Sequence, residues 1–90
     1  MKIAFDIDGT LDAGGSPNKW VHGELLKFEE QGHEIIVWSG GGVDYAKRYV
    51  NRHNLPARVV IKCSEDVDIA FDDVATNLPN AGLTITVPYL

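Results

Sequence analysis

Two carboxylates near the start of the chain have a type and spacing that could do chemistry. Asp6 and Asp8 lie in and just after the apolar run Ile3 to Ile7, and Gly9 and Thr10 follow them. Because alternate residues of a strand leave the same face, these two side chains would lie close together and repel each other. A hard divalent cation with oxygen ligands would remove that repulsion. An isolated Asp-x-Asp triple is also typical of a solvated strand end, so its meaning depends on the rest of the chain.

Three later apolar runs also end in residues that can handle a phosphate or a metal ion. These residues are Ser39 after the second run, Lys62 after the third, and Asp72 with Asp73 after the fourth. In an open parallel sheet the carboxyl ends of all strands lie along one edge, where ligands bind at the topological switch point. We therefore expect these side chains to meet the two N-terminal carboxylates.

Each of these groups has a chemical use on a phosphate monoester. A carboxylate can accept a phosphoryl group as an aspartyl phosphate. A second carboxylate two residues later can protonate the leaving oxygen and then deprotonate the attacking water. The Ser39 hydroxyl and the Gly40 amide could donate hydrogen bonds to a phosphate, and Lys62 would offset negative charge in the transition state. Because phosphate and carboxylates repel, Mg²⁺ is the expected bridging ion.

The elements that would position these residues alternate between strand and helix. The apolar runs and the helical spacing of apolar residues predict where the strands and helices begin and end. Ser16 is the expected N-cap of the first helix. The expected strands are Ile3–Ile7, Glu34–Trp38, Arg58–Ile61, Asp68–Phe71 and Leu83–Val87, and the expected helices are Pro17–Gln31 and Val43–His53, with one helical turn around Val74–Asn77. Strands and helices that alternate at short intervals predict a parallel sheet with helices packed on its faces.

Composition limits the class of protein. At 90 residues the chain is expected to form one small domain over residues 1–90. The net charge of -5 argues against broad binding of nucleic-acid backbones but allows one local phosphate site. Cys63 is the only cysteine, so an intrachain disulfide is excluded and secretion finds no support. The N-terminal apolar run is broken by Asp6, so we expect no signal peptide, no membrane partner and a cytoplasmic location.

Taken in order, these motifs resemble those of the haloacid dehalogenase superfamily, a family dominated by Mg²⁺-dependent phosphatases. The resemblance covers essentially the whole chain. The matching segments are Asp6-Ile-Asp-Gly-Thr10-Leu for the first motif, Ser39-Gly40 for the second, Lys62 for the third and Ile69-Ala-Phe-Asp72-Asp73 for the fourth. The resemblance implies a three-layer, Rossmann-like α/β fold with a parallel sheet of about five strands in the order 5-4-1-2-3.

The resemblance also implies roles for individual residues. Asp6 would be the nucleophile and Asp8 the general acid and base. Mg²⁺ would be bound by the Asp6 carboxylate, the Asp8 main-chain carbonyl and the acids of the fourth motif, with Asp72 favoured over Asp73. Family members usually carry a cap domain, but the gap Leu11 to Pro17 is too short for one. We therefore expect an open site that accepts a phosphorylated small molecule or an exposed phosphate of a macromolecule.

Two other functions stay open at this point. A non-catalytic module could keep the Mg²⁺ and phosphate site but act together with a partner protein. A receiver-type signalling domain fits less well, because its phosphorylated aspartate normally ends the third strand, where this chain has Lys62. The last strand, Thr84 to Leu90, could leave an edge open to pairing, so an oligomer is possible. The substrate itself is not specified by any motif.

Overall fold

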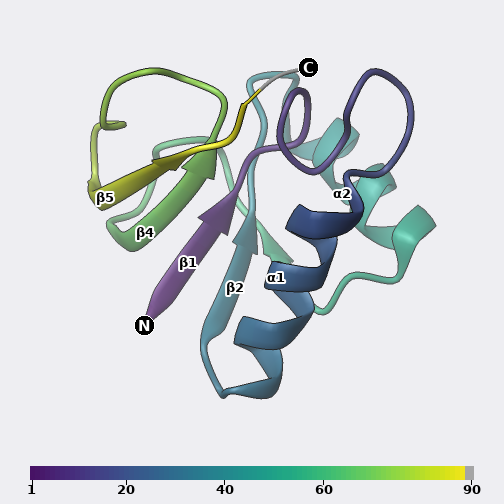
Figure 1. The fold of residues 1–90 in the computed structure, drawn as a ribbon, viewed down its shortest axis with the longest axis horizontal. Helices are drawn as coiled ribbons and strands as arrows, with labels where there is room; N and C mark the ends of the chain where they lie inside the picture. The colour runs from purple at the N-terminus through teal and green to yellow at the C-terminus, as the bar shows by residue number, and fades with distance from the viewer. Residues whose placement is uncertain (89–90) are drawn as a thin grey trace.

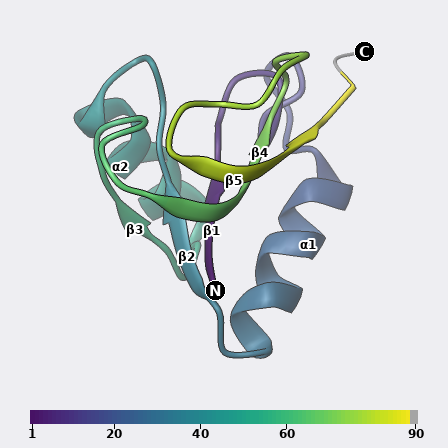
Figure 2. The same ribbon diagram turned by 90° about the vertical axis from the view of Figure 1, so that its left-hand side faces the viewer.

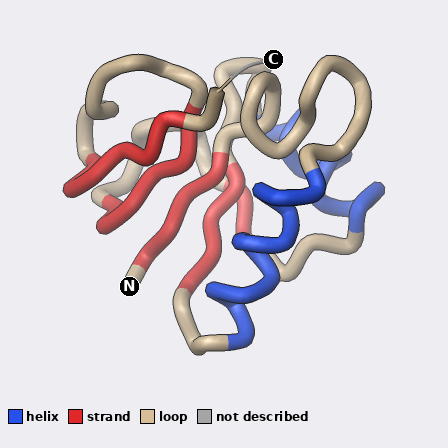
Figure 3. The backbone as a smooth tube through the Cα atoms, in the orientation of Figure 1, coloured by secondary structure: helices blue, strands red, loops and turns tan. Residues whose placement is uncertain are grey.

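Five parallel strands form one sheet in the order β3-β2-β1-β4-β5 (Figures 1 and 3). The computed structural model describes residues 1–88. Its elements are β1 (Lys2–Phe5), α1 (Lys19–Glu30), β2 (Glu34–Val37), α2 (Val43–His53), β3 (Arg58–Val59), β4 (Val67–Asp72) and β5 (Ala81–Thr86). The expected strand order, read from the other edge, is therefore confirmed, and the protein is a small α/β protein.

The register of the central strands brings their carboxyl ends to the same level. Phe5 of β1 is paired with Val37 of β2 on one side and with Phe71 of β4 on the other. The Asp6 amide continues this ladder by donating a hydrogen bond of 3.0 Å to the Phe71 carbonyl. Asp6 and Asp72 therefore leave neighbouring strands at adjacent positions.

Both helices pack on the same face of the sheet, to the right of the central strands in Figure 1. The buried side chains of that core include Ile3, Phe5, Val21, Leu25, Ala46 and Val50. The other face buries a smaller cluster around Ile36, Trp38 and Ala70. Within residues 1–88 no helix lies in the connections 60–66 and 73–80, which return toward the opposite edge of the sheet.

The expected three-layer arrangement is consequently not confirmed. Right-handed crossovers carry β1-α1-β2 and β2-α2-β3 over one face, because both connections move in the same direction across the sheet. The connections after β3 and β4 move in the other direction, so the same rule sends them over the other face. Figure 2 shows β5, the strand that these connections finally reach, at the outer edge of the sheet.

Local boundaries differ from the sequence prediction at several points. Helix α2 has the expected bounds, but α1 begins at Lys19 because Asn18, and not Ser16, is its N-cap. The Asn18 side chain accepts hydrogen bonds from the amides of Trp20 (3.1 Å) and Val21 (3.3 Å). Pro17 instead forms an isolated antiparallel bridge with Asp12, which holds it outside the helix.

The helical turn expected around Val74–Asn77 does not form, and the segment consists of bends. The Val74 amide donates to Asp72 Oδ1 (3.1 Å), and the Val74 carbonyl accepts from the Thr86 hydroxyl (2.8 Å). Because side chains use both of these backbone groups, the segment is tied to β4 and β5. The part of the expected last strand over residues 89–90 lies outside the described residues. Among residues 1–88, no helix is long and apolar enough to cross a membrane.

Candidate functional site

Three acidic side chains converge at the carboxyl edge of the sheet. One carboxylate oxygen from each of Asp6, Asp72 and Asp73 lies within 4.8 Å of the other two. Asp6 follows β1 and is 6% exposed, Asp72 ends β4 and is 0% exposed, and Asp73 is exposed. The predicted meeting of Asp6 and Asp72 is therefore confirmed, and the physical reason is the shared register of β1 and β4.

Lys62 supplies the positive charge of this cluster. Its Nζ lies 2.8 Å from Asp72 Oδ2 and 3.3 Å from Asp6 Oδ1. Lys62 lies in a turn beyond β3, which ends at Val59, so its side chain reaches the cluster from a loop. Within residues 1–88, Asp72 Oδ2 accepts no well-aligned hydrogen bond and has this ion pair as its polar contact. The lysine is thus the counter-charge of a fully buried carboxylate.

The electrostatics of the cluster favour an additional cation. Burial, together with the charge of Asp72, raises the pKa of Asp6 to about 6 against the opposing effect of Lys62. Burial and a contact with Asp72 also raise the pKa of Asp73. Burial alone would lower the pKa of Lys62, but its interactions with Asp72 and Asp6 outweigh burial and raise that pKa. One lysine therefore does not remove the mutual repulsion of these acids.

The donor set fits a hard divalent ion. Ligand oxygens about 2.1 Å from Mg²⁺ lie about 3.0 Å apart when adjacent and about 4.2 Å apart when opposite. The separations within 4.8 Å among Asp6, Asp72 and Asp73 need only a small contraction to reach these values. The Asp8 carbonyl accepts none of the backbone hydrogen bonds described for this loop, so it is available as a further oxygen donor.

The side chain of Asp8 is not part of the acidic cluster. It is exposed, and its Oδ1 accepts a hydrogen bond of 2.7 Å from the Tyr45 hydroxyl. The expectation that Asp6 and Asp8 leave one face of a strand together is wrong, because β1 ends at Phe5 and Asp8 lies in the following turn. The hydrogen bond to Asp8 is the largest cause of a raised Tyr45 pKa, about 12.

Sequence reasoning missed Tyr45. The available signal was a tyrosine in the first turn of α2, immediately after the Ser39 loop, where a long side chain can reach the neighbouring loop. A contact between Tyr45 and Asp8 joins the first turn of α2 to the loop after β1, so neither local pattern contains it. It became visible only once β1 and β2 were placed side by side.

The loop after β2 lies next to this tyrosine. Ser39 is buried, and its Oγ accepts a hydrogen bond of 3.0 Å from the Gly41 amide, which leaves the hydroxyl proton free to donate. Gly40 is exposed. A Cβ at Gly41 would lie 3.0 Å from the Tyr45 ring and 3.3 Å from Ser39 Oγ, so a larger residue there would push the ring or the serine aside by a few tenths of an ångström. Ser39 and Gly40 thus adjoin the Tyr45–Asp8 pair.

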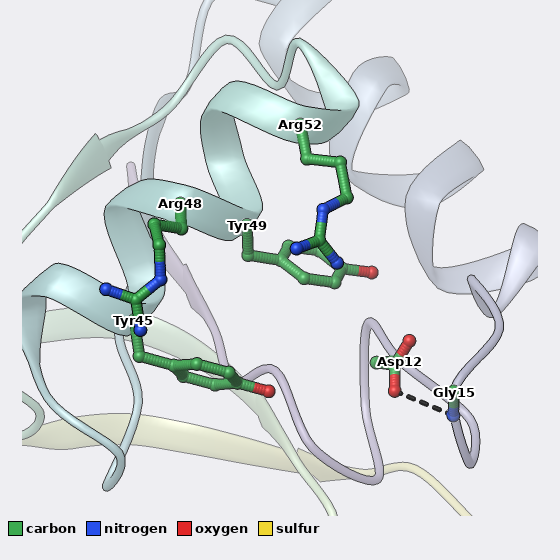
Figure 4. Close-up of a pocket in the computed structure, with 6 residues that line it drawn as sticks. All are labelled: Asp12, Gly15, Tyr45, Arg48, Tyr49 and Arg52. Atoms are coloured by element: carbon green, nitrogen blue, oxygen red, sulfur yellow. Dashed lines mark hydrogen bonds between the residues drawn. The ribbon is translucent and has the colours of Figure 1, made fainter.

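Two cavities lie beside the loop that follows β1. One, of about 380 Å³, is lined by Asp8, Gly9, Asp12, Gly14, Gly15 and Asp73. The second, of about 250 Å³, is lined by Asp12, Gly15, Tyr45, Arg48, Tyr49 and Arg52 (Figure 4). The loop is fastened to α2, because the Tyr49 hydroxyl donates a hydrogen bond of 3.1 Å to the Leu11 carbonyl. The first cavity borders the acidic cluster through Asp73.

Comparison of the chain with protein-family models, curated proteins and solved structures found no match. The chemistry open to the site therefore follows from its own residues. A buried carboxylate, a lysine and two further acids at one edge of a parallel sheet can bind a divalent cation and a phosphate together. Asp8 lies outside the cluster but lines the adjoining cavity.

Proposed function

We propose that the protein is a Mg²⁺-dependent phosphomonoester hydrolase that acts through an aspartyl phosphate on Asp6. The observation that carries the proposal is the convergence of Asp6, Asp72, Asp73 and Lys62 at the carboxyl edge of the sheet. The resemblance of the four sequence motifs to haloacid dehalogenase phosphatases supports the same reaction. The substrate is a phosphorylated small molecule or an exposed phosphate of a macromolecule.

In the first step an Asp6 carboxylate oxygen attacks phosphorus, and the bond from phosphorus to the leaving oxygen breaks. Asp8, in its protonated form, gives its proton to that oxygen. In the second step the Asp8 carboxylate takes a proton from water while the water oxygen attacks the phosphoryl group. The bond between phosphorus and Asp6 then breaks, which releases phosphate and restores both carboxyl groups.

The other residues bind and orient. Lys62, 3.3 Å from Asp6 Oδ1, would offset the charge that develops on the transferred group. The free proton of the Ser39 hydroxyl and the Gly40 amide can donate hydrogen bonds to phosphate oxygens. Bound Mg²⁺ would neutralise the repulsion between phosphate and carboxylates, held by the acidic cluster and the Asp8 carbonyl.

The test compares two Asp→Asn variants on a generic aryl phosphate with Mg²⁺. Asp6→Asn should reduce kcat by about a thousandfold or more, because the nucleophile is lost. Asp66→Asn is the matched control, since Asp66 is exposed and directly precedes β4, at the opposite end of the strand from the site. Phosphate should be trapped on the wild-type protein and not on Asp6→Asn. Full activity in Asp6→Asn would refute the mechanism.

A second candidate is a non-catalytic module that binds Mg²⁺ and phosphate and acts with a partner. The observation that favours it is the double ion pair of Lys62 with Asp6 and Asp72, which already neutralises part of the cluster. Calorimetry should then detect Mg²⁺ binding, weakened in Asp72→Asn, while a broad panel of phosphate esters shows no turnover. Steady turnover of any ester would remove this candidate.

A further inference from the structure

The cavity beside α2 carries positive charge that the proposed chemistry does not use. Arg48 and Arg52 are four residues apart on α2, so both side chains leave the same face of the helix. Figure 4 shows them with Tyr45 and Tyr49, whose hydroxyls point toward the loop of Asp12 and Gly15. A helix face with two arginines and two tyrosines thus lines one wall of a cavity of about 250 Å³.

Neither arginine is neutralised within residues 1–88. The ion pairs of the described residues involve Lys2, Arg58 and Lys62, and none involves Arg48 or Arg52. Both side chains are exposed, so they are accessible to an anion from solution in a chain whose net charge is -5. Like charges one helical turn apart destabilise a helix, and an anion between them would relieve that cost.

One acid shares the cavity, but its geometry leaves the arginines free. Asp12 Oδ2 accepts a hydrogen bond of 2.9 Å from the Gly15 amide, which turns this carboxylate into the loop. Among the ion pairs of residues 1–88, none joins Asp12 to either arginine. Two guanidinium groups against one carboxylate leave the cavity with an excess of positive charge, and paired guanidinium hydrogen bonds suit phosphate oxygens.

The cavity adjoins the one beside the proposed active site. Asp12 and Gly15 line both cavities. Tyr45 lines the arginine cavity and donates its hydrogen bond to Asp8, which lines the other. In the proposed reaction Asp8 protonates the leaving oxygen, so the group attached to that oxygen lies beside Asp8, and the neighbouring Tyr45 marks a path toward the arginines.

We propose that Arg48 and Arg52 bind a second phosphate, carried by the leaving group. The preferred substrates are then phosphomonoesters with another phosphate on the same molecule. The inference rests on the proposed function for the direction of the leaving group. A small bisphosphate and the phosphorylated end of a nucleic-acid strand share this chemistry. The net charge of -5 limits the contact with a strand to this one local site.

The first test measures binding without turnover. Adenosine 3′,5′-bisphosphate and the two adenosine monophosphates are titrated with Mg²⁺ into the Asp6→Asn protein by calorimetry. We expect the bisphosphate to bind about tenfold more tightly than either monophosphate, as for a charge-assisted contact between partly solvated groups. The double variant Arg48→Gln, Arg52→Gln on the same background should lose that preference.

A matched variant separates specific contacts from total charge. Lys19→Gln with Lys47→Gln removes the same charge from exposed helix positions that line neither cavity, and it should keep the preference. Both double variants are then made in the protein that keeps Asp6. In each, kcat/KM is measured for the bisphosphate and for the monophosphates, and the ratio of the two values is compared. A terminally phosphorylated dinucleotide forms the second substrate arm, and its rank against the bisphosphate identifies the source of the second phosphate.

The outcomes distinguish the two proposals. A binding preference that disappears only in the arginine double variant supports the phosphate subsite, whether or not any ester is hydrolysed. Equal binding of bisphosphate and monophosphates, or an equal loss in the lysine control, overturns the subsite even if aryl phosphate is hydrolysed normally. Absence of turnover on every ester overturns the hydrolase proposal, and the calorimetric binding preference then decides by itself whether the two arginines bind phosphate.

Discussion

Replacement of Asp6 by asparagine is expected to stabilise the metal-free protein at neutral pH. The Asp6 carboxylate is buried, and the nearby charge of Asp72 adds repulsion, so its pKa is raised from 3.8 to about 6. Asparagine keeps the shape of the side chain and removes the charge. Lys62 retains its ion pair of 2.8 Å with Asp72, so the substitution leaves no buried charge alone.

The sign and size of the effect follow from proton linkage. Between about pH 4 and pH 6 the folded protein holds a proton on Asp6 that the unfolded chain has released. The free energy of unfolding therefore falls as the pH rises through this window, and the full penalty is present above about pH 6. A pKa shift of about two units corresponds to about 3 kcal/mol. Asp6→Asn should recover most of that at pH 7.5 and almost none at pH 4.

Urea denaturation in the presence of a chelator measures the effect. The quantity of interest is the difference in unfolding free energy between Asp6→Asn and wild type, because all other titrating groups are shared. Asp66→Asn serves as the control, because it also replaces a carboxylate by an amide but at an exposed position at the opposite end of β4 from the site. Added Mg²⁺ at pH 7.5 should stabilise wild type more than Asp6→Asn. A difference that does not change between pH 4 and pH 7.5, or an Asp6→Asn protein less stable than wild type at pH 7.5, would refute the reasoning.

Three further substitutions test packing around the site and the sheet. Tyr45→Phe should lower kcat on an aryl phosphate about tenfold with little change in KM, because Asp8 loses the hydrogen bond of 2.7 Å that orients its side chain; an unchanged kcat would contradict this. Gly41→Ala should cause a smaller loss of kcat, because its Cβ would lie 3.0 Å from the Tyr45 ring and would displace that ring. Its effect should not add to that of Tyr45→Phe. Gly82→Ala should lower the free energy of unfolding by about 1–3 kcal/mol in urea, since its Cβ would lie 2.9 Å from the Asp68 carbonyl oxygen.

The strand order and most of the acidic site could be predicted from the sequence. Short apolar runs that alternate with segments of helical periodicity predict a parallel sheet, and the right-handedness of crossover connections leaves few possible topologies for it. The resemblance to the haloacid dehalogenase superfamily implied the order 5-4-1-2-3, which sets the residue after β1 beside the last residue of β4, and this is why Asp6 and Asp72 were correctly expected to meet. The bounds of α2 also followed from its residues, which carry a clear apolar stripe through Ala46 and Val50.

Other features depend on contacts between segments far apart in the chain. Ser16 and Asn18 are both good capping residues, and the bridge between Pro17 and Asp12 favoured the second. The helical turn around Val74–Asn77 was lost because side chains of β4 and β5 took the backbone groups of Val74. Local propensity is weak, and a few tertiary hydrogen bonds are enough to override it.

The types of the residues and the spacing of the apolar ones were enough to establish the alternation of strands and helices. They also showed which strand ends carry carboxylates. They were not enough to show that Asp8 turns away from Asp6 toward Tyr45, or that Arg48 and Arg52 share a cavity with that tyrosine. The lack of a helix on the second face of the sheet, within residues 1–88, also emerged only from the folded chain. The physical reason is that the direction of a side chain beyond the end of a strand is set by the loops packed against it. Those loops come together only when the sheet has formed.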